Sequence, residues 1–182
     1  MASAIKEVKS VGHLINGVIK HSSGSSLDIY NPAKGSISRS LNLATKETVE
    51  KAIISAEKAF PMWKDTPIIK RARIMYRFKE LLEKNSNKIC QLIGEEHGKI
   101  SHDAMGELQR GIENVEYACS APEFLKGEHS KNVGSSIDCW SELHPLGVVA
   151  GITPFNFPAM IPLWMYPPVS YTHLTLPTIL RV

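Results

Sequence analysis

The chain has 182 residues, of which 43% are hydrophobic, so it is long enough to bury a substantial core. Its 21 lysine and arginine residues against 18 aspartate and glutamate residues leave a net charge of only +3, and the basic residues are spread thinly. We therefore expect no nucleic-acid partner, because such proteins gather basic residues into a patch or stripe. Cys90, Cys119 and Cys139 match neither a disulfide framework nor a zinc pattern, which predicts no metal site and a reducing compartment.

The N-terminal stretch MASAIKEVKS has neither the apolar core of a signal peptide nor the arginine-rich face of a transit peptide. We expect a cytoplasmic location, or the mitochondrial matrix in a eukaryote, although no transit peptide is visible. The longest apolar stretch, residues 148–165, is interrupted by Pro154, Asn156, Pro158 and Pro162. No membrane association is therefore expected.

The N-terminal part of the chain predicts a β-hairpin meander. Asn16-Gly17 lies between two short apolar runs, and such a pair is the strongest signal for a two-residue hairpin turn. Residues 26–30 alternate like a half-buried strand, and residues 37–41 form a further strand after the turn at Gly35. We interpret the meander as structural rather than as a binding element.

Four amphipathic helices are predicted next, from apolar residues that recur at helical spacing. The first helix is expected to begin after an N-cap at Thr45 and to stop at Pro61, and the second to begin near Pro67 and to break at residues 85–87. The third is expected over residues 89–96, with its end at Gly98, and the fourth is expected to begin near Ser101. The fourth helix carries its apolar face on Ala104, Leu108, Ile112, Val115 and Ala118.

A polar connection over residues 123–136 and an extended arm over residues 137–143 follow these helices. An exposed strand that carries Trp140 favours aggregation unless another subunit covers it. We therefore expect the segment of about residues 131–145 to be an oligomerisation arm.

Residues 147–164, GVVAGITPFNFPAMIPLW, have a different pattern from the rest of the chain. Residues 148–152 are apolar on both faces, as in a buried parallel strand, and a tight loop and a helix follow them. Because Pro162 lies one turn into that helix, the helix either starts later or is kinked. A strand, a loop and a helix predict the first Rossmann-like βα unit of an α/β fold, where ligands bind beyond the carboxyl end of the strand.

Asn156 is the sharpest catalytic candidate in this loop. Its carboxamide is a neutral hydrogen-bond donor that could stabilise an oxyanion, although many turn asparagines only bond to their own backbone. The neighbouring residues 152–155 could line a nucleotide crevice, yet no GxGxxG or P-loop motif follows the strand. The pattern alone indicates an α/β enzyme with a candidate ligand loop.

Several motifs together resemble the N-terminal part of an aldehyde dehydrogenase. They are PLGVVAGITPFNFP, NPAKGSI, AEKAFPMWKDTP, EEHGKI and the downstream Glu107, and the resemblance covers residues 13–167. Phenylalanine at position 155, with AMIPLWMYP and EYACS, is similar to the CoA-acylating methylmalonate-semialdehyde (malonate-semialdehyde) dehydrogenase branch of the superfamily. The resemblance therefore identifies the chain as an incomplete NAD-binding domain, which comprises the meander, the helices, the arm and the first βα unit.

The resemblance implies NAD-dependent oxidation of methylmalonate or malonate semialdehyde, with CoA, to propionyl-CoA or acetyl-CoA and CO2, in valine and related catabolism. The implied partners are the small aldehyde and CoA, and the full-length enzyme is expected to be a homo-oligomer. Asn156 matches the family's catalytic oxyanion-hole asparagine, whereas Thr153 and Phe155 match loop positions that bind NAD. The family's nucleophilic cysteine lies further along, so the three cysteines present are interpreted as structural and the 182-residue chain as inactive.

The resemblance stops at Pro167, which divides the chain into a partial domain over residues 1–167 and a tail over residues 168–182. Residues 169–178 can be back-translated into a transposon-type sequencing adapter. We interpret the tail as non-native, and a genuine β-rich terminus is the alternative.

Two other functions compete with the acylating enzyme. A hydrolytic aldehyde dehydrogenase would release a free acid, and it would carry a general-base glutamate in the part of the family sequence that this chain does not match. A non-catalytic interaction module, which would use the arm and the helices as its surface, is a more distant alternative. It predicts a stable fold that NAD does not affect.

Overall fold

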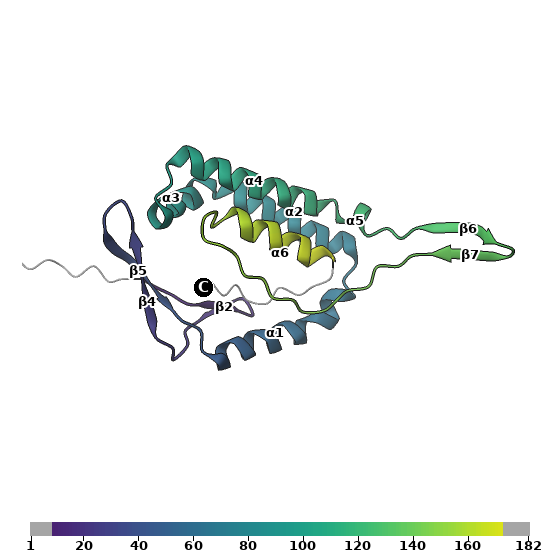
Figure 1. Cartoon of the computed structure of the whole chain (residues 1–182), viewed down its shortest axis with the longest axis horizontal. Coiled ribbons are helices and arrows are strands. Elements are labelled where there is room, and N and C mark those ends of the chain that lie inside the picture. Colours follow the sequence, from purple (N-terminus) through teal and green to yellow (C-terminus); the bar gives the residue numbers. More distant parts are fainter. Residues whose placement is uncertain (1–8, 173–182) are drawn as a thin grey trace, which may run out of the picture.

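The computed structural model describes residues 9–172, which form a mixed α/β structure with a long projecting hairpin (Figure 1). The strands are β1 (Lys9–Val11), β2 (His13–Ile15), β3 (Val18–Lys20), β4 (Ser26–Asn31), β5 (Ser36–Asn42), β6 (His129–Gly134) and β7 (Ile137–Trp140). The helices are α1 (Lys46–Lys64), α2 (Ile68–Lys84), α3 (Ser86–His97), α4 (Ser101–Cys119), α5 (Ala121–Phe124) and α6 (Met160–Thr172).

The N-terminal strands form two small sheets. β2 and β3 pair as an antiparallel hairpin, and its turn residues Asn16 and Gly17 have φ values of 51° and 73°, so the predicted hairpin turn is confirmed. β5 is the centre of a three-stranded sheet in the order β1-β5-β4, parallel to β1 and antiparallel to β4. Sequence reasoning identified β4 and β5 and missed the three-residue strand β1.

Helix α4 lies at the centre of the helical layer, packed against α2, α3 and α6. All five residues predicted for its apolar face are at most 3% exposed. Four of them join Cys90 and Ile93 of α3 and Leu163 of α6 in the main hydrophobic core, whereas Ala118 packs with Ala121 in a smaller cluster. The apolar spacing in the sequence therefore identified the central helix correctly.

Two of the predicted helix ends follow local capping rules, and a third does not. The hydroxyl of Thr45 accepts a hydrogen bond from the backbone N–H of Thr48, as expected of an N-cap, and Gly98 ends α3 with a left-handed φ of 83°. The expected stop at Pro61 is wrong, because α1 continues to Lys64. A proline removes only one helical hydrogen bond, and the Trp63 indole N–H anchors the last turn to the backbone oxygen of Ser170 at 2.9 Å.

The strand predicted for residues 148–152 is not observed. Residues 141–154 have no regular secondary structure, and Ile152 is 86% exposed. A parallel strand exists only through hydrogen bonds to its neighbours, and within residues 9–172 no strand lies beside this segment to provide them. The predicted βα unit is therefore represented by its loop and by helix α6.

Helix α6 begins at Met160, so the alternative of a later start was correct, and Pro162 lies in the first turn. Pro167 removes the N–H that would bond to the backbone oxygen of Leu163. The side-chain amide of Asn114 on α4 donates to that oxygen instead, at 2.9 Å. The proline is thereby accommodated inside the helix, and α6 is fixed against α4.

Strands β6 and β7 form the projecting hairpin, which extends away from the rest of the molecule (Figure 1). Part of the polar connection predicted over residues 123–136 is wrong, because β6 pairs with β7. β6 was missed because its sequence, HSKNVG, lacks the alternation of apolar and polar residues that marks a strand. Its extended conformation depends on the pairing with β7. Trp140 is 74% exposed, so the predicted arm is present, and its role in oligomerisation remains a prediction.

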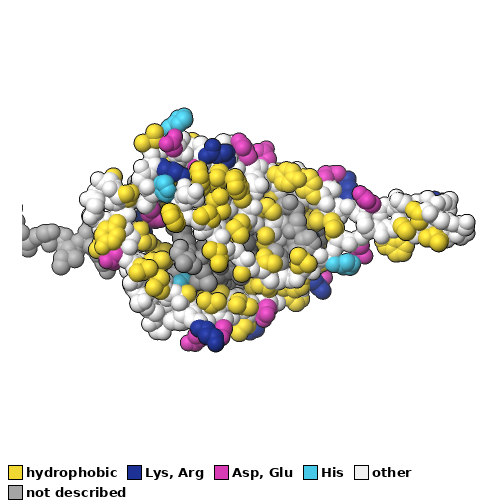
Figure 2. All heavy atoms as spheres, viewed as in Figure 1, with side chains coloured by type: hydrophobic (Ala, Val, Ile, Leu, Met, Phe, Trp, Pro, Cys, Tyr) yellow, Lys and Arg dark blue, Asp and Glu magenta, His cyan; other side chains and the backbone are white. Residues whose placement is uncertain are grey.

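Hydrophobic side chains gather over the face shown in Figure 2 and on the arm. None of the helices within residues 9–172 has the length and apolar character needed to cross a bilayer. Helix α6 continues through Pro168 to Thr172, across the expected junction of the tail, and residues 173–182 lie outside the described residues. The origin of residues 168–182 remains a prediction.

Candidate functional site

The candidate site is the loop that precedes α6. After β7 the chain runs back along the molecule in an extended conformation and reaches the start of α6 (Figure 1). Thr153, Phe155 and Asn156 lie at the end of this segment. Asn156 is exposed, and no hydrogen bond to its carboxamide is present in the part of the chain that the structure describes. Its N–H groups are therefore available to a ligand.

A buried carboxylate lies directly behind this loop. Glu107, on the inner face of α4, is 0% exposed. Its Oε1 accepts hydrogen bonds from the backbone N–H groups of Ala159 at 2.8 Å and Met160 at 3.2 Å. These N–H groups begin α6 and have no partner within the helix, so the carboxylate caps the helix with a favourable charge.

Lys99 connects that carboxylate to Asn156. Its Nζ lies 2.5 Å from Oε2 of Glu107 and donates to the backbone oxygen of Asn156 at 2.8 Å. The same ammonium lies over the ring of Phe157, 4.0 Å from the centroid, and the guanidinium of Arg110 is 5.8 Å from that centroid. Lys99, just before α4, and Glu107, on α4, thus hold the backbone at Asn156 and at the residues that follow it.

Thr153 and Phe155, the two predicted cofactor-binding residues, line one crevice. Its volume is about 310 Å³, and its walls include Pro154 and Pro158 of the loop and apolar residues of β1, β4 and β5. Phe155 is 84% exposed, so its ring is free to contact a ligand. Asn156 is not a lining residue, which places the proposed oxyanion donor beside the crevice and not inside it.

The three cysteines do not gather at this site. Burial raises the pKa of the Cys90 thiol, with a smaller contribution from the charge of Glu107, and burial also raises the pKa of Cys119. Cys139 is exposed on the arm. A raised pKa disfavours the thiolate, so Cys90 and Cys119 suit a structural role, as the sequence predicted.

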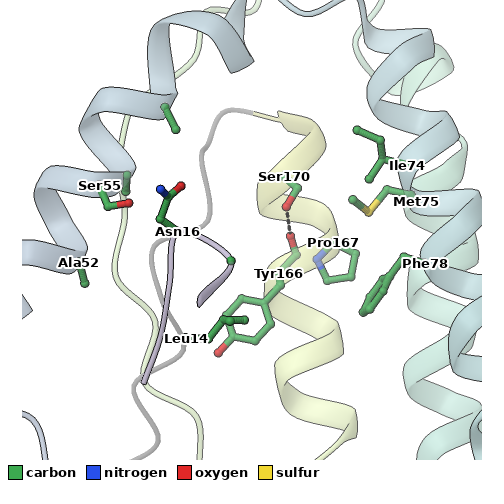
Figure 3. A pocket seen from close by; sticks show the side chains of 13 residues that line it. Leu14, Asn16, Ala52, Ser55, Ile74, Met75, Phe78, Tyr166, Pro167 and Ser170 are labelled. Carbon is green, nitrogen blue, oxygen red and sulfur yellow. Dashed lines mark hydrogen bonds between the residues drawn. The ribbon is translucent and has the colours of Figure 1, made fainter. Parts of the chain in front are cut away.

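A second cavity of about 420 Å³ lies between the β2–β3 hairpin, α1, α2 and α6 (Figure 3). Its labelled side chains are mainly apolar, among them Leu14, Met75 and Phe78, and the only drawn hydrogen bond joins the Ser170 hydroxyl to the backbone oxygen of Tyr166. Among the described residues its lining has no carboxylate, histidine, lysine or thiol, and the phenol of Tyr166 is its one titratable group. This cavity therefore offers fewer groups for catalysis than the loop around Asn156 does.

The sequence analysis used Glu107 and, within EEHGKI, Lys99 only as parts of the resemblance, and it missed the contacts of both residues. A signal was present, since Glu107 lies within the apolar stripe of α4, beside Leu108 and three residues after Ala104. A carboxylate at such a position must find a buried cation or N–H partners. Which groups those partners are depends on how the loop before α6 packs against α4. The spacing of residues within one segment does not predict that packing.

Comparisons with known proteins agree with one another. The model of the aldehyde dehydrogenase family matches residues 18–172. The chain is 61% identical to the malonate-semialdehyde dehydrogenase of Pseudomonas aeruginosa over 155 residues, which are 85% of this chain and 31% of the relative. It is 47% identical to malonate-semialdehyde dehydrogenase 1 of Geobacillus kaustophilus, over 88% of this chain and 33% of that relative. The chain therefore spans about a third of the length of the curated relatives it matches.

Solved structures show the same likeness. The crystal structure of methylmalonate-semialdehyde dehydrogenase from Oceanimonas doudoroffii matches with a TM-score of 0.89 and 62% identity, over 92% of this chain and 34% of that one. A structure from Sinorhizobium meliloti 1021, complexed with NAD, matches with a TM-score of 0.87 and 38% identity, over 91% of this chain and 34% of that one.

Proposed function

Because this chain belongs to the aldehyde dehydrogenase family, we propose that the protein carrying it is a CoA-acylating dehydrogenase of malonate or methylmalonate semialdehyde that uses NAD. The observation that carries the proposal is the identity of 61–62% to relatives named for these two substrates. The NAD-complexed relative supports the cofactor. Since the chain spans about a third of its relatives, the proposed activity is that of the whole protein.

The proposed reaction begins with addition of a cysteine thiolate to the aldehyde carbon, which places negative charge on the aldehyde oxygen. We assign Asn156 to donate a side-chain hydrogen bond to that oxygen, because its amide is exposed and unpaired among the described residues. Loss of a hydride from the same carbon leaves a thioester, and CoA then takes the acyl group and frees the thiol. Loss of CO2, with uptake of a proton at the carbon that carried the carboxylate, gives acetyl-CoA or propionyl-CoA.

NAD supplies the hydride acceptor for this reaction when it is bound. The crevice beside Asn156 offers the Thr153 side chain and the exposed Phe155 ring, which fit contacts to a polar and flat group. Its volume of about 310 Å³ is at the small end for ligand sites, so these residues would hold only part of a dinucleotide. The remaining contacts would come from the part of the family length that this chain does not span.

None of the three cysteines is proposed as the nucleophile, because Cys90 and Cys119 are buried and Cys139 lies on the arm. The 182-residue chain alone is accordingly expected to produce no NADH from semialdehyde, NAD and CoA. The bacterial origin of the relatives supports a cytoplasmic location for the whole enzyme.

Product analysis separates the acylating enzyme from a hydrolytic one. The full-length enzyme is incubated with malonate semialdehyde and NAD, with and without CoA, and the products are identified by mass spectrometry. We expect acetyl-CoA and CO2 in amounts that match the NADH formed. A free acid formed at the same rate without CoA would instead establish hydrolytic chemistry.

A further inference from the structure

We propose that the buried Lys99–Glu107 pair holds the Asn156 amide in its working position, so that both residues are positioning residues for the reaction. This inference rests on the proposed function, because it concerns the oxyanion donor assigned there. Neither residue points its charged group at the crevice beside the loop, since neither belongs to the crevice lining. Their effect on the reaction would pass through the loop backbone.

Both residues of the pair contact the backbone at or just after Asn156. Lys99 bonds to its backbone oxygen at 2.8 Å and lies over the next residue, Phe157. Glu107 holds the N–H groups of Ala159 and Met160, three and four residues further on. One ion pair thus fixes the backbone at Asn156 and immediately after it.

The side chains of the pair are shielded from solvent, that of Glu107 completely and that of Lys99 for the most part. The Glu107 side chain is 0% exposed and that of Lys99 is 15% exposed. A buried ion pair contributes little net stability compared with an apolar pair of the same volume, whereas its directional bonds fix one geometry. The other lysine–glutamate pairs in the described chain, such as Lys79–Glu83 on α2, join residues only three or four positions apart and connect no distant segments.

No strand or helix supports the loop before Asn156. Residues 141–154 have no regular secondary structure, so no such element orients the amide from that side. A displacement of about 1 Å in a catalytic group can reduce the rate by about 100-fold. Loss of the Lys99 bond is therefore expected to lower kcat by about 10- to 100-fold while KM for NAD changes by less than about threefold.

The test uses the full-length enzyme with the paired substitution Lys99→Met and Glu107→Gln. Changing both residues leaves no unpaired buried charge, and glutamine retains an oxygen that can accept from Ala159 and Met160. The matched control is Lys79→Met with Glu83→Gln, which removes a pair of similar length, 2.8 Å, on the α2 surface. The control is expected to keep the wild-type kcat.

A combination with Asn156→Ala distinguishes positioning from a general loss of structure. If the pair acts through Asn156, the variant with all three substitutions has the kcat of Asn156→Ala alone, within about twofold. A purely structural role would multiply the two losses. That multiplication would overturn the proposal.

The remaining outcomes are also decisive. A wild-type kcat in Asn156→Ala would overturn the oxyanion role and the positioning role together. If Asn156→Ala has a strongly lowered kcat while the paired variant keeps the wild-type kcat, only the positioning role would be overturned. If the paired variant does not fold, Lys99→Met alone removes the bond to the Asn156 backbone oxygen, and a wild-type kcat in that variant would equally contradict the proposal.

Discussion

At the scale of single residues, the sequence predicted a role for Asn156 but not the contacts of Glu107 and Lys99. The amide of Asn156 was predictable, because a donor that does not titrate suits an oxyanion and its loop motif resembles a family motif. The contacts behind it were not predictable, because Glu107 and Lys99 reach residues 156–160 only after the chain has travelled along the arm and back. Local spacing carries no information on such a return.

Cysteine reactivity gives a prediction at this scale. Burial raises the pKa of Cys90 and Cys119, so at a given pH less thiolate is present than in a free cysteine, and their labelling begins at higher pH. In the 182-residue chain at pH 8, iodoacetamide is expected to modify exposed Cys139 at least tenfold faster, as measured by peptide mass spectrometry. Cys139→Ser should remove the fast reaction. Labelling of Cys90 at the rate of Cys139 would contradict the structure.

At the scale of elements, sequence signals that act within one segment were reliable. The Asn16-Gly17 turn, the Thr45 cap, the Gly98 helix end and the apolar stripe of α4 all depend on neighbouring residues. Elements that depend on distant partners were not. β6 forms through pairing with β7, and residues 148–152 remain irregular because no strand among the described residues pairs with them.

The packing of α6 on α4 gives a prediction at this scale. A Cβ at Gly111 would lie 2.7 Å from Cδ1 of Leu163 and 3.3 Å from the Cα of Met160. Gly111→Ala should therefore lower the free energy of unfolding by about 1–3 kcal/mol, as measured by urea denaturation of the full-length enzyme. Gly106, on the same helix, has nothing within 4 Å of such a Cβ, so Gly106→Ala should raise stability by about 0.5–1 kcal/mol. Equal effects at the two positions would contradict the packing.

At the scale of the whole molecule, large apolar side chains beside the loop remain exposed. Ile152 and Phe155 are 86% and 84% exposed, and the chain spans about a third of its relatives' length. Such apolar surface is normally covered by other parts of a protein or by a partner. The α/β class was predictable from strand and helix patterns, whereas the absence of a sheet beside residues 148–152 followed only from the structure.

The arm gives the prediction for assembly. Trp140 and Ile137 are 74% and 55% exposed on a hairpin that projects from the fold, which suits burial against another subunit. Trp140→Glu in the full-length enzyme is expected to shift the species seen in sedimentation velocity to a smaller assembly. Lys46→Glu, at a 92% exposed side chain on α1, should leave the assembly unchanged. A wild-type monomer, or an unchanged assembly in Trp140→Glu, would contradict the role of the arm.

Asn156 is proposed to donate to the oxyanion formed from the aldehyde, and one comparison of turnover numbers tests this role most directly. Asn156→Ala in the full-length enzyme is assayed for NADH formation with saturating malonate semialdehyde, NAD and CoA. Loss of one oxyanion donor is expected to lower kcat by about 100- to 1,000-fold, with KM for NAD nearly unchanged. A kcat within about twofold of wild type would contradict the account.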